Sequence, residues 1–398
     1  MNILIVNMYY FPNMMGGAEY SVKLLAEGLA QKGQRVSVLT MDGTPEGNIE
    51  IPEQIAGVYV YRSYCPSIYR RRILGDKSRK SEKLKNGLLS IRNPQMNRDI
   101  REVVRMTEPD VIHTNNLVSM SCWIWLFAGK HKIKTVHTLR DYWLLDPTTE
   151  PGKSRGIFLT LFKGYHRKLS NRIYGAVTSP SERTMQIFQE EGYFRNCVRK
   201  MIVNSIFFDR NLLEECTKKK VKRENEKIIF LYAGTLTENK GVRILIQAFL
   251  EAGLRQAELH LYGEGDLKEW IAEKTKGTDA VKLFGKVRQD VLFEGYRKAD
   301  VMIVPSVWEE PFGRIVIEAA QYALPVIGSN RGGIPETVHA IGFGDVYQFD
   351  SVDELCGLIT KYTDRVFVRQ MIETGPDHME NYAIERQIER MEDLYRRL

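Results

Sequence analysis

Residues 301–327 read VMIVPSVWEEPFGRIVIEAAQYALPVI, and this stretch decides the fold. A short apolar run at 301–304 is followed by a loop with proline and glycine, an apolar-periodic segment at 315–322 and a second apolar run at 325–327. The two short runs predict buried strands, and the segment between them predicts a helix. A strand–helix–strand unit joins parallel strands through a right-handed crossover, which indicates an α/β sheet.

The same alternation extends along both halves of the chain. Further strands are predicted at 2–6, 35–39, 111–113, 134–136, 228–232, 258–262 and 281–284, and helices at 18–31, 242–250 and 382–398. Because 398 residues exceed one ordinary core, we expect two doubly wound, Rossmann-like domains. The lysine-rich stretch 214–227 is interpreted as a solvated linker or helix end.

Composition favours a globular protein of the cytoplasm. The chain is 43% hydrophobic and 27% charged, and its five cysteines are scattered without a C-x-x-C pair. This pattern argues against a disulfide framework or a zinc site and predicts reduced thiols. The chain begins directly on a predicted strand without a signal peptide, and no apolar run approaches a membrane span.

Positive charge is concentrated in two stretches. Residues 62–105 hold thirteen Lys/Arg against four Asp/Glu, and residues 153–172 hold six against none. These stretches are either a solvated basic surface or an electropositive face for anionic lipid or a phosphate-bearing acceptor. The apolar run 157–162 is either a buried helix face or a segment that lies on a membrane. Nucleic acid is disfavoured, because no aromatic-rich module accompanies the charge.

Three loops that follow predicted strands could bind ligands. Gly16 and Gly17 precede a helix, where backbone N–H groups could meet an anion, and the alternative is an ordinary glycine-rich turn. The spacing lacks the G-x-G-x-x-G pattern of a dinucleotide fold. Lys240 also precedes a helix and could meet a phosphate, or be a solvated lysine. Glu310 and Glu318 flank Gly313 and could face one cleft, where carboxylates and backbone donors suit sugar hydroxyls.

Taken in order, these motifs resemble a known family. The Gly16-Gly17 loop, the loop at 234–241, the Glu310-x7-Glu318 pair with Phe312-Gly313, and the segment GGIPE at 332–336 resemble the retaining GT-B glycosyltransferases of family 4. The resemblance implies two facing Rossmann-like domains with a deep cleft between them. Residues 1–206 would bind the acceptor, residues 207–380 the nucleotide-sugar, and helix 381–398 would cross back to the first domain.

The resemblance also implies roles for individual residues. Lys240 would hold the donor diphosphate and Glu318 the ribose, while Glu310 with the backbone of Phe312 and Gly313 would hold the sugar hydroxyls. Val287 would lie beside the base. The remaining residues expected in the donor site are Gly16, Gly17, Gly234, Thr235 and Gly263.

The chain departs from the family pattern at two positions. Thr235 stands where the family usually has arginine, and Arg140 where it usually has histidine. We hypothesise that Arg140 restores the missing cationic charge, which makes Arg140 a catalytic candidate beside Lys240 and Glu310. His137 is near in sequence, but it is not taken as the missing histidine.

The expected reaction follows from the resemblance. A sugar would pass from a nucleotide-sugar, UDP-sugar favoured and GDP-sugar possible, to a glycan or lipid-linked acceptor in surface polysaccharide or glycoconjugate synthesis. No Asp-x-Asp motif is present, so a metal-independent, front-face displacement without other cofactors is expected. The location would be cytoplasmic, with a possible peripheral position on the inner membrane face. The alternatives are a GT-B sugar-nucleotide epimerase and a catalytically weak nucleotide-sugar-binding subunit.

Overall fold

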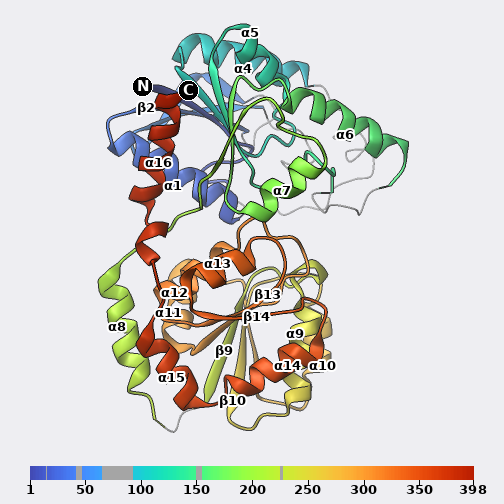
Figure 1. Cartoon of the computed structure of the whole chain (residues 1–398), viewed down its shortest axis with the longest axis vertical. Coiled ribbons are helices and arrows are strands. Elements are labelled where there is room, and N and C mark those ends of the chain that lie inside the picture. Colours follow the sequence, from blue (N-terminus) through green and yellow to red (C-terminus); the bar gives the residue numbers. More distant parts are fainter. Residues whose placement is uncertain (15, 42–46, 65–92, 149–154, 225–226) are drawn as a thin grey trace. The chain divides into compact units, whose positions relative to one another are not determined.

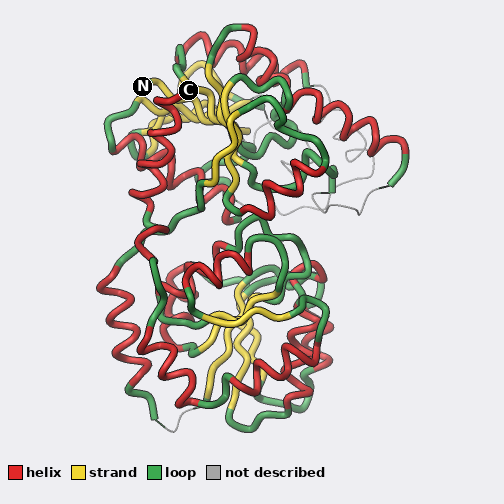
Figure 2. Tube along the Cα trace, in the orientation of Figure 1, coloured by secondary structure: helices red, strands yellow, loops and turns green. Residues whose placement is uncertain are grey.

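The computed structural model describes the chain except for residues 15, 42–46, 65–92, 149–154 and 225–226. The chain divides into two compact units, Met1–Ser205 with Ile384–Leu398, and Ile206–Ala383. The domain boundaries predicted from the sequence lie between residues 206 and 207 and between residues 380 and 381. Each unit is a sheet with helices packed around it (Figure 1; Figure 2).

The first unit contains an eight-stranded sheet in the order β3-β4-β2-β1-β5-β6-β7-β8. All neighbouring strands are parallel except β3 and β4. Its strands are β1 (Asn2–Val6), β2 (Arg35–Met41), β3 (Asn48–Ile55), β4 (Val58–Ser63), β5 (Val111–Thr114), β6 (Lys134–Thr138), β7 (Gly175–Ser179) and β8 (Val198–Met201). Its helices are α1 (Gly17–Gln31), α4 (Pro94–Thr107), α5 (Trp123–Lys130), α6 (Ile157–Ser170), α7 (Glu182–Glu190) and α16 (Ile384–Arg397).

The closing helix α16 is part of the first unit's core. Its apolar face, including Ile388 and Tyr395, is buried against α1 and the sheet. Gly28 of α1 allows the close approach, because a Cβ there would lie 2.2 Å from the Ile388 side chain. The last residues of the chain therefore help to fold its first domain.

The second unit contains a six-stranded parallel sheet in the order β11-β10-β9-β12-β13-β14. Its strands are β9 (Ile228–Ala233), β10 (Ala257–Tyr262), β11 (Val281–Gly285), β12 (Val301–Val304), β13 (Val326–Ser329) and β14 (Gly344–Tyr347). Its helices are α8 (Arg210–Val221), η1 (Glu238–Lys240), α9 (Val242–Ala252), α10 (Lys268–Lys274), α11 (Gln289–Lys298), α12 (Arg314–Gln321), α13 (Ile334–Ile341), α14 (Val352–Lys361), α15 (Arg365–Thr374) and η2 (Met379–Tyr382).

The predicted pair of doubly wound α/β domains is confirmed. In the second unit the strand order reverses between β9 and β12, and in the first between β1 and β5. In open parallel sheets the crevice for ligands lies at the carboxyl ends of the strands at this reversal. The loops after β9, β12 and β1 are those that carry Lys240, Glu310 and the Gly16-Gly17 pair.

The interpretation of 214–227 as a solvated stretch is wrong for Lys220. This residue lies on α8 and is only 3% exposed. Its ammonium donates hydrogen bonds to the carbonyl oxygens of Tyr296 (2.9 Å) and Ala299 at the C-terminal end of α11. The negative end of the helix dipole attracts a cation there. Desolvation lowers the Lys220 pKa to about 7, partly opposed by the nearby Asp300.

Candidate functional site

Lys240 lies at the strand reversal of the second unit because a glycine follows it. Gly241 has φ +70°, and a Cβ there would lie 1.7 Å from the carbonyl oxygen of Pro305. No other residue allows the loop after β9 to approach the loop after β12 so closely. The carbonyl of Asn239 accepts hydrogen bonds from the backbone N–H groups of Val307 (3.1 Å) and Trp308 (3.0 Å). The two loops are therefore joined beside Lys240.

Lys240 and Glu310 form an ion pair at this junction. The Ser306 hydroxyl donates to the same Glu310 oxygen at 3.2 Å, and the Lys240 ammonium lies 4.8 Å from the ring centroid of Trp308. The two side chains keep 27% and 18% of their exposure, so the pair is partly desolvated and open to a ligand. The structure thus brings together two predicted site residues that are 70 positions apart.

Helix α12 begins directly after the same loop. Gly313 is its N-cap with φ +79°, and no side chain caps its first turn. The Phe312 side chain is buried against Tyr382, with ring centroids 6.2 Å apart, so only the Phe312 backbone could contact a ligand. Glu318, one turn into the helix, is half-buried and pairs with Arg314 at 2.9 Å. Desolvation raises the Glu318 pKa, partly opposed by Arg314.

The other predicted donor residues lie on neighbouring loops at the carboxyl ends of β9, β10 and β11. Gly234 and Gly263 touch, because a Cβ on Gly263 would lie 1.7 Å from the Gly234 carbonyl oxygen. Thr235 is exposed, and its carbonyl accepts the Tyr232 hydroxyl at 2.6 Å. Val287 is half-buried just after β11.

In the first unit, Gly16 and Gly17 are exposed at the N-terminus of α1. The buried carboxylate of Glu19 belongs to the same first turn and lies 3.7 Å from the position of a Cβ on Gly16. A ligand anion at this helix end would therefore meet a negative charge as well as the helix dipole. Anion binding by Gly16 and Gly17 stays a prediction.

Arg140 follows β6 and is only 7% exposed. Its guanidinium donates to the side-chain oxygen of Asn115 at 3.1 Å and to that of Asn204. Neither asparagine was predicted as a site residue, although Asn115 is a polar residue immediately after β5, which is a position typical of ligand-site residues. Two amide oxygens thus set the orientation of the arginine that stands in the family's histidine position.

His137 has a structural environment. It is buried, accepts or donates a hydrogen bond with the Thr114 hydroxyl at 2.9 Å, and packs edge-on against Trp125. Desolvation lowers the His137 pKa to about 3, with a smaller contribution from Arg140. A neutral histidine held inside the sheet agrees with leaving it out of the site.

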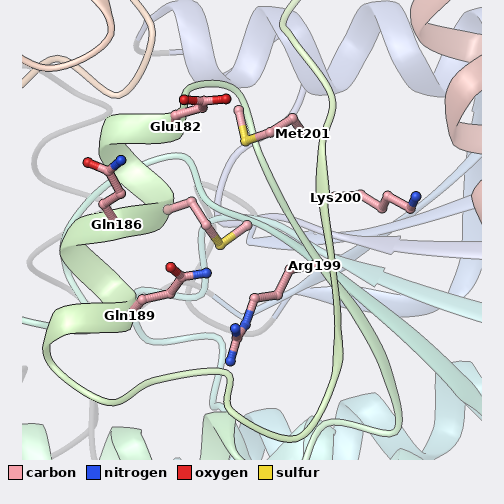
Figure 3. Close-up of a pocket in the computed structure, with 7 residues that line it drawn as sticks. Glu182, Gln186, Gln189, Arg199, Lys200 and Met201 are labelled. Carbon is pink, nitrogen blue, oxygen red and sulfur yellow. The ribbon is translucent and has the colours of Figure 1, made fainter.

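A separate pocket of about 280 Å³ lies in the first unit between α7 and the edge strand β8 (Figure 3). It is lined by Glu182, Met185, Gln186, Gln189, Arg199, Lys200 and Met201. None of the residues predicted for the site lines it. The charged residues Lys240 and Glu310 lie instead on the loops at the strand reversal of the second unit.

Two further observations concern metals and membranes. Among the described residues, no cluster of three or more His, Cys, Asp or Glu side chains could hold a metal ion. In the same part of the chain, every helix is too short or too polar to cross a bilayer.

Comparisons with known proteins agree with this geometry. Residues 15–199 match the model of Glycosyltransferase Family 4, and residues 227–360 match the model of Glycosyl transferases group 1. An uncharacterized 42.6 kDa protein of the cps region of Klebsiella pneumoniae is 29% identical over 84% of this chain and 87% of its own. The phosphatidyl-myo-inositol mannosyltransferase of Mycolicibacterium smegmatis is 25% identical over 90% of this chain and 83% of its own.

The fold has solved relatives as well. The Anabaena protein HepE, solved in complex with UDP, superposes with a TM-score of 0.69 over the full length of both chains at 19% identity. The two family models match most of both units, and the match at 227–360 contains the strand reversal between β9 and β12. The chain therefore belongs to the family 4, or group 1, glycosyltransferases of the GT-B fold.

Proposed function

We propose that the chain transfers a sugar from a UDP-sugar, or alternatively a GDP-sugar, to a glycan or lipid-linked acceptor, with retention of configuration and without a metal ion. The observation that supports this most is the Lys240–Glu310 pair at the strand reversal of the second unit. It places a cation for phosphate beside a carboxylate for hydroxyl groups. HepE, which has the same fold, is described in complex with UDP.

Each member of the pair has a distinct task in this proposal. The Lys240 ammonium has three N–H donors, so it can contact a diphosphate oxygen while it keeps its bond to Glu310. It stabilises the negative charge that develops on the leaving nucleoside diphosphate. Glu310 accepts hydrogen bonds from sugar hydroxyls, and the backbone N–H groups at Phe312 and Gly313 donate to them.

The chemical step needs no protein nucleophile. The bond between the anomeric carbon and the diphosphate oxygen breaks, and the acceptor oxygen bonds to the same face of that carbon. The acceptor's proton passes to the departing phosphate oxygen. Positive charge and helix N-termini would replace a metal ion as the stabiliser of the leaving group.

A donor panel tests the proposal directly. Purified protein is incubated with UDP- and GDP-sugars, with and without a lipid-linked acceptor pool, and nucleotide release is measured in excess chelator. Acceptor-dependent release that persists in chelator is expected, with an α-configured product from an α-linked donor. Release that strictly needs added Mg²⁺ or Mn²⁺ would refute the metal-independent mechanism. An epimerase would convert the donor without acceptor, and a binding subunit would release nothing.

Arg140 is proposed to stabilise donor phosphate in place of the arginine missing at position 235. Its support is that Asn115 and Asn204 hold a buried guanidinium at a strand end. Arg140→Ala should lower kcat/KM about 13- to 160-fold, the equivalent of losing a charge-assisted contact of about 1.5–3 kcal/mol. Thr235→Arg should recover part of this loss in a double-mutant cycle. Strictly additive effects would show that the two positions share no phosphate.

We propose that the protein docks on the membrane surface through the start of α6. Ile157 and Leu161 are 81% and 66% exposed, and Phe158 is exposed beside them, whereas Phe162 is buried. The helix therefore presents an apolar end as well as basic residues, including Lys168. Of the other basic stretch, 65–92 lies outside the described residues. Sedimentation with anionic liposomes should show binding that falls with salt; absence of binding at low salt would favour an acceptor free in solution.

A further inference from the structure

The loop that carries Glu310 is fastened to the loop after β13. The Gly333 N–H donates to the Glu310 carbonyl at 2.7 Å, and the Ser329 hydroxyl donates to the Ser306 carbonyl at 2.6 Å. Gly332 has φ +57°, and a Cβ there would lie 2.0 Å from the Glu310 carbonyl oxygen. The two loops are in backbone contact, so a displacement of one moves the other.

Glu309 strengthens this contact with both oxygens of its side chain. One oxygen accepts the Gly332 N–H at 2.8 Å, and the other lies 3.2 Å from a terminal nitrogen of Arg331. The Glu309 side chain is largely buried in this position. A carboxylate that accepts a backbone N–H and pairs with a guanidinium is restricted to one orientation.

Arg331 contacts two loops besides its own. Its Nε donates to the Val307 carbonyl at 2.9 Å, and its guanidinium carbon lies 4.0 Å from the ring centroid of Phe349. Val307 is in the loop after β12, and Phe349 follows β14. One side chain therefore joins the loops at the carboxyl ends of three neighbouring strands.

We propose that Glu309 and Arg331 are positioning residues that hold the Glu310 loop in the geometry that recognises the donor sugar. The proposal rests on the proposed role of Glu310 and deepens it. The pair contacts the Val307 carbonyl and the Gly332 N–H beside the Glu310 carbonyl, whereas the loop that carries Lys240 keeps its separate contacts to Pro305 and to the N–H groups of Val307 and Trp308. Its loss should therefore weaken recognition of the sugar more than recognition of the nucleotide diphosphate.

The test compares Glu309→Ala, Glu309→Gln, Arg331→Gln and Arg331→Lys with a matched control, Arg297→Gln. Arg297 is 35% exposed against 32% for Arg331, pairs with Glu294 at 3.3 Å, and lies 5.3 Å from the ring centroid of Tyr322. Losing it removes a similar ion pair and cation–π contact in the same unit. Hydrogen exchange of the apo protein is followed at 305–313 and 330–333, and affinities for UDP and UDP-glucose are measured by calorimetry.

We expect Arg331→Gln and Glu309→Gln to speed exchange in both segments and to weaken UDP-glucose binding about fivefold, as for a partly exposed ion pair. UDP binding should change less than twofold. Glu309→Ala should have the larger effect, because the glutamine still accepts the Gly332 N–H. Arg331→Lys should be intermediate, because one ammonium cannot reproduce the fork and the ring contact. The control should change neither quantity.

Unchanged exchange in both Glu309→Ala and Arg331→Gln would overturn the proposal, as would UDP-glucose affinity equal to that of wild type. Equal losses for UDP and UDP-glucose would also overturn it, because they would indicate general damage to the site. If the wild-type protein prefers guanine, GDP and a GDP-sugar replace these ligands, and failure to bind any of the four would instead count against the proposed function. The exchange comparison would still decide whether Glu309 and Arg331 hold the loop.

Discussion

Substitutions in the Lys240–Glu310 pair should separate nucleotide recognition from sugar recognition. Lys240→Ala removes a charge-assisted contact to diphosphate of about 1.5–3 kcal/mol. In the free protein the same ammonium already pairs with Glu310, and the pair keeps 27% and 18% exposure. Such a pair is worth about 1 kcal/mol or less, and a diphosphate must share or replace it.

The net loss in Lys240→Ala should therefore be about 0.5–3 kcal/mol, a roughly 2- to 160-fold weaker binding of both UDP and UDP-sugar. Glu310→Gln should act differently. It removes a negative charge that competes for Lys240, so UDP binding should stay equal or strengthen by up to about fivefold. The affinity for UDP-sugar should fall relative to the affinity for UDP, because the side chain at position 310 no longer offers a carboxylate to accept hydrogen bonds from the sugar hydroxyls.

Titration calorimetry with UDP and UDP-sugar at low and high salt measures both effects, and GDP and GDP-sugar replace them if the protein prefers guanine. Lys361→Ala is the control, because Lys361 pairs with Asp345 at 2.7 Å elsewhere in the second unit. Equal diphosphate affinity in wild type and Lys240→Ala would refute the assignment of Lys240. Parallel losses for UDP and UDP-sugar in Glu310→Gln would refute the assignment of Glu310 to the sugar.

Three other outcomes are expected. Glu318→Ala should weaken nucleotide-sugar binding at least about tenfold, measured by the same calorimetry; unchanged affinity would remove Glu318 from the ribose site. Gly241→Ala should cost about 1–2 kcal/mol of unfolding free energy from positive φ alone, and it should weaken UDP binding, since its Cβ would lie 1.7 Å from the Pro305 oxygen; an unaltered midpoint in denaturant would contradict this. Because the pKa of His137 is lowered in the folded protein, this residue takes up a proton between pH 7 and pH 5 only in the unfolded chain, and it should remove about 2 kcal/mol of folding stability as pH falls over that range. His137→Phe should flatten the dependence of unfolding free energy on pH, and an unchanged dependence would argue against a buried neutral histidine.

Much of the fold could be predicted because the sheet strands are short apolar runs between helical patterns. The run at 301–304 and the helix after Gly313 lie where the pattern placed them. The pattern failed where burial depends on distant partners. Lys220 reads as part of a solvated lysine cluster, yet two carbonyl groups about 80 positions later in the chain bury it. No feature of the sequence around Lys220 indicates these hydrogen-bond acceptors.

The residues of the candidate site likewise fall into those that local sequence predicts and those that it does not. Glycines with obligatory backbone conformations, such as Gly241 and Gly313, could be located from the sequence because they interrupt strand-to-helix connections. The two asparagines that hold Arg140 could not, since Asn204 is 64 positions away and lies in a loop of no recognisable motif. Sequence motifs indicate which backbone segments form a ligand loop, whereas side-chain partners depend on the folded arrangement.

The meeting of Lys240 and Glu310 illustrates how topology converts separate motifs into one site. Lys240 follows β9, from which the chain builds the sheet toward β11. Glu310 follows β12, from which the chain builds the sheet in the opposite direction toward β14. If β12 had been added beyond β11, two strands would lie between β9 and β12, and their loops would be three strand spacings apart, about 14 Å. The reversal places β12 next to β9 instead, and the Gly241–Pro305 contact then brings the loops together. A lysine that would be unremarkable in its own loop thus acquires a carboxylate partner, and the strand order is the cause.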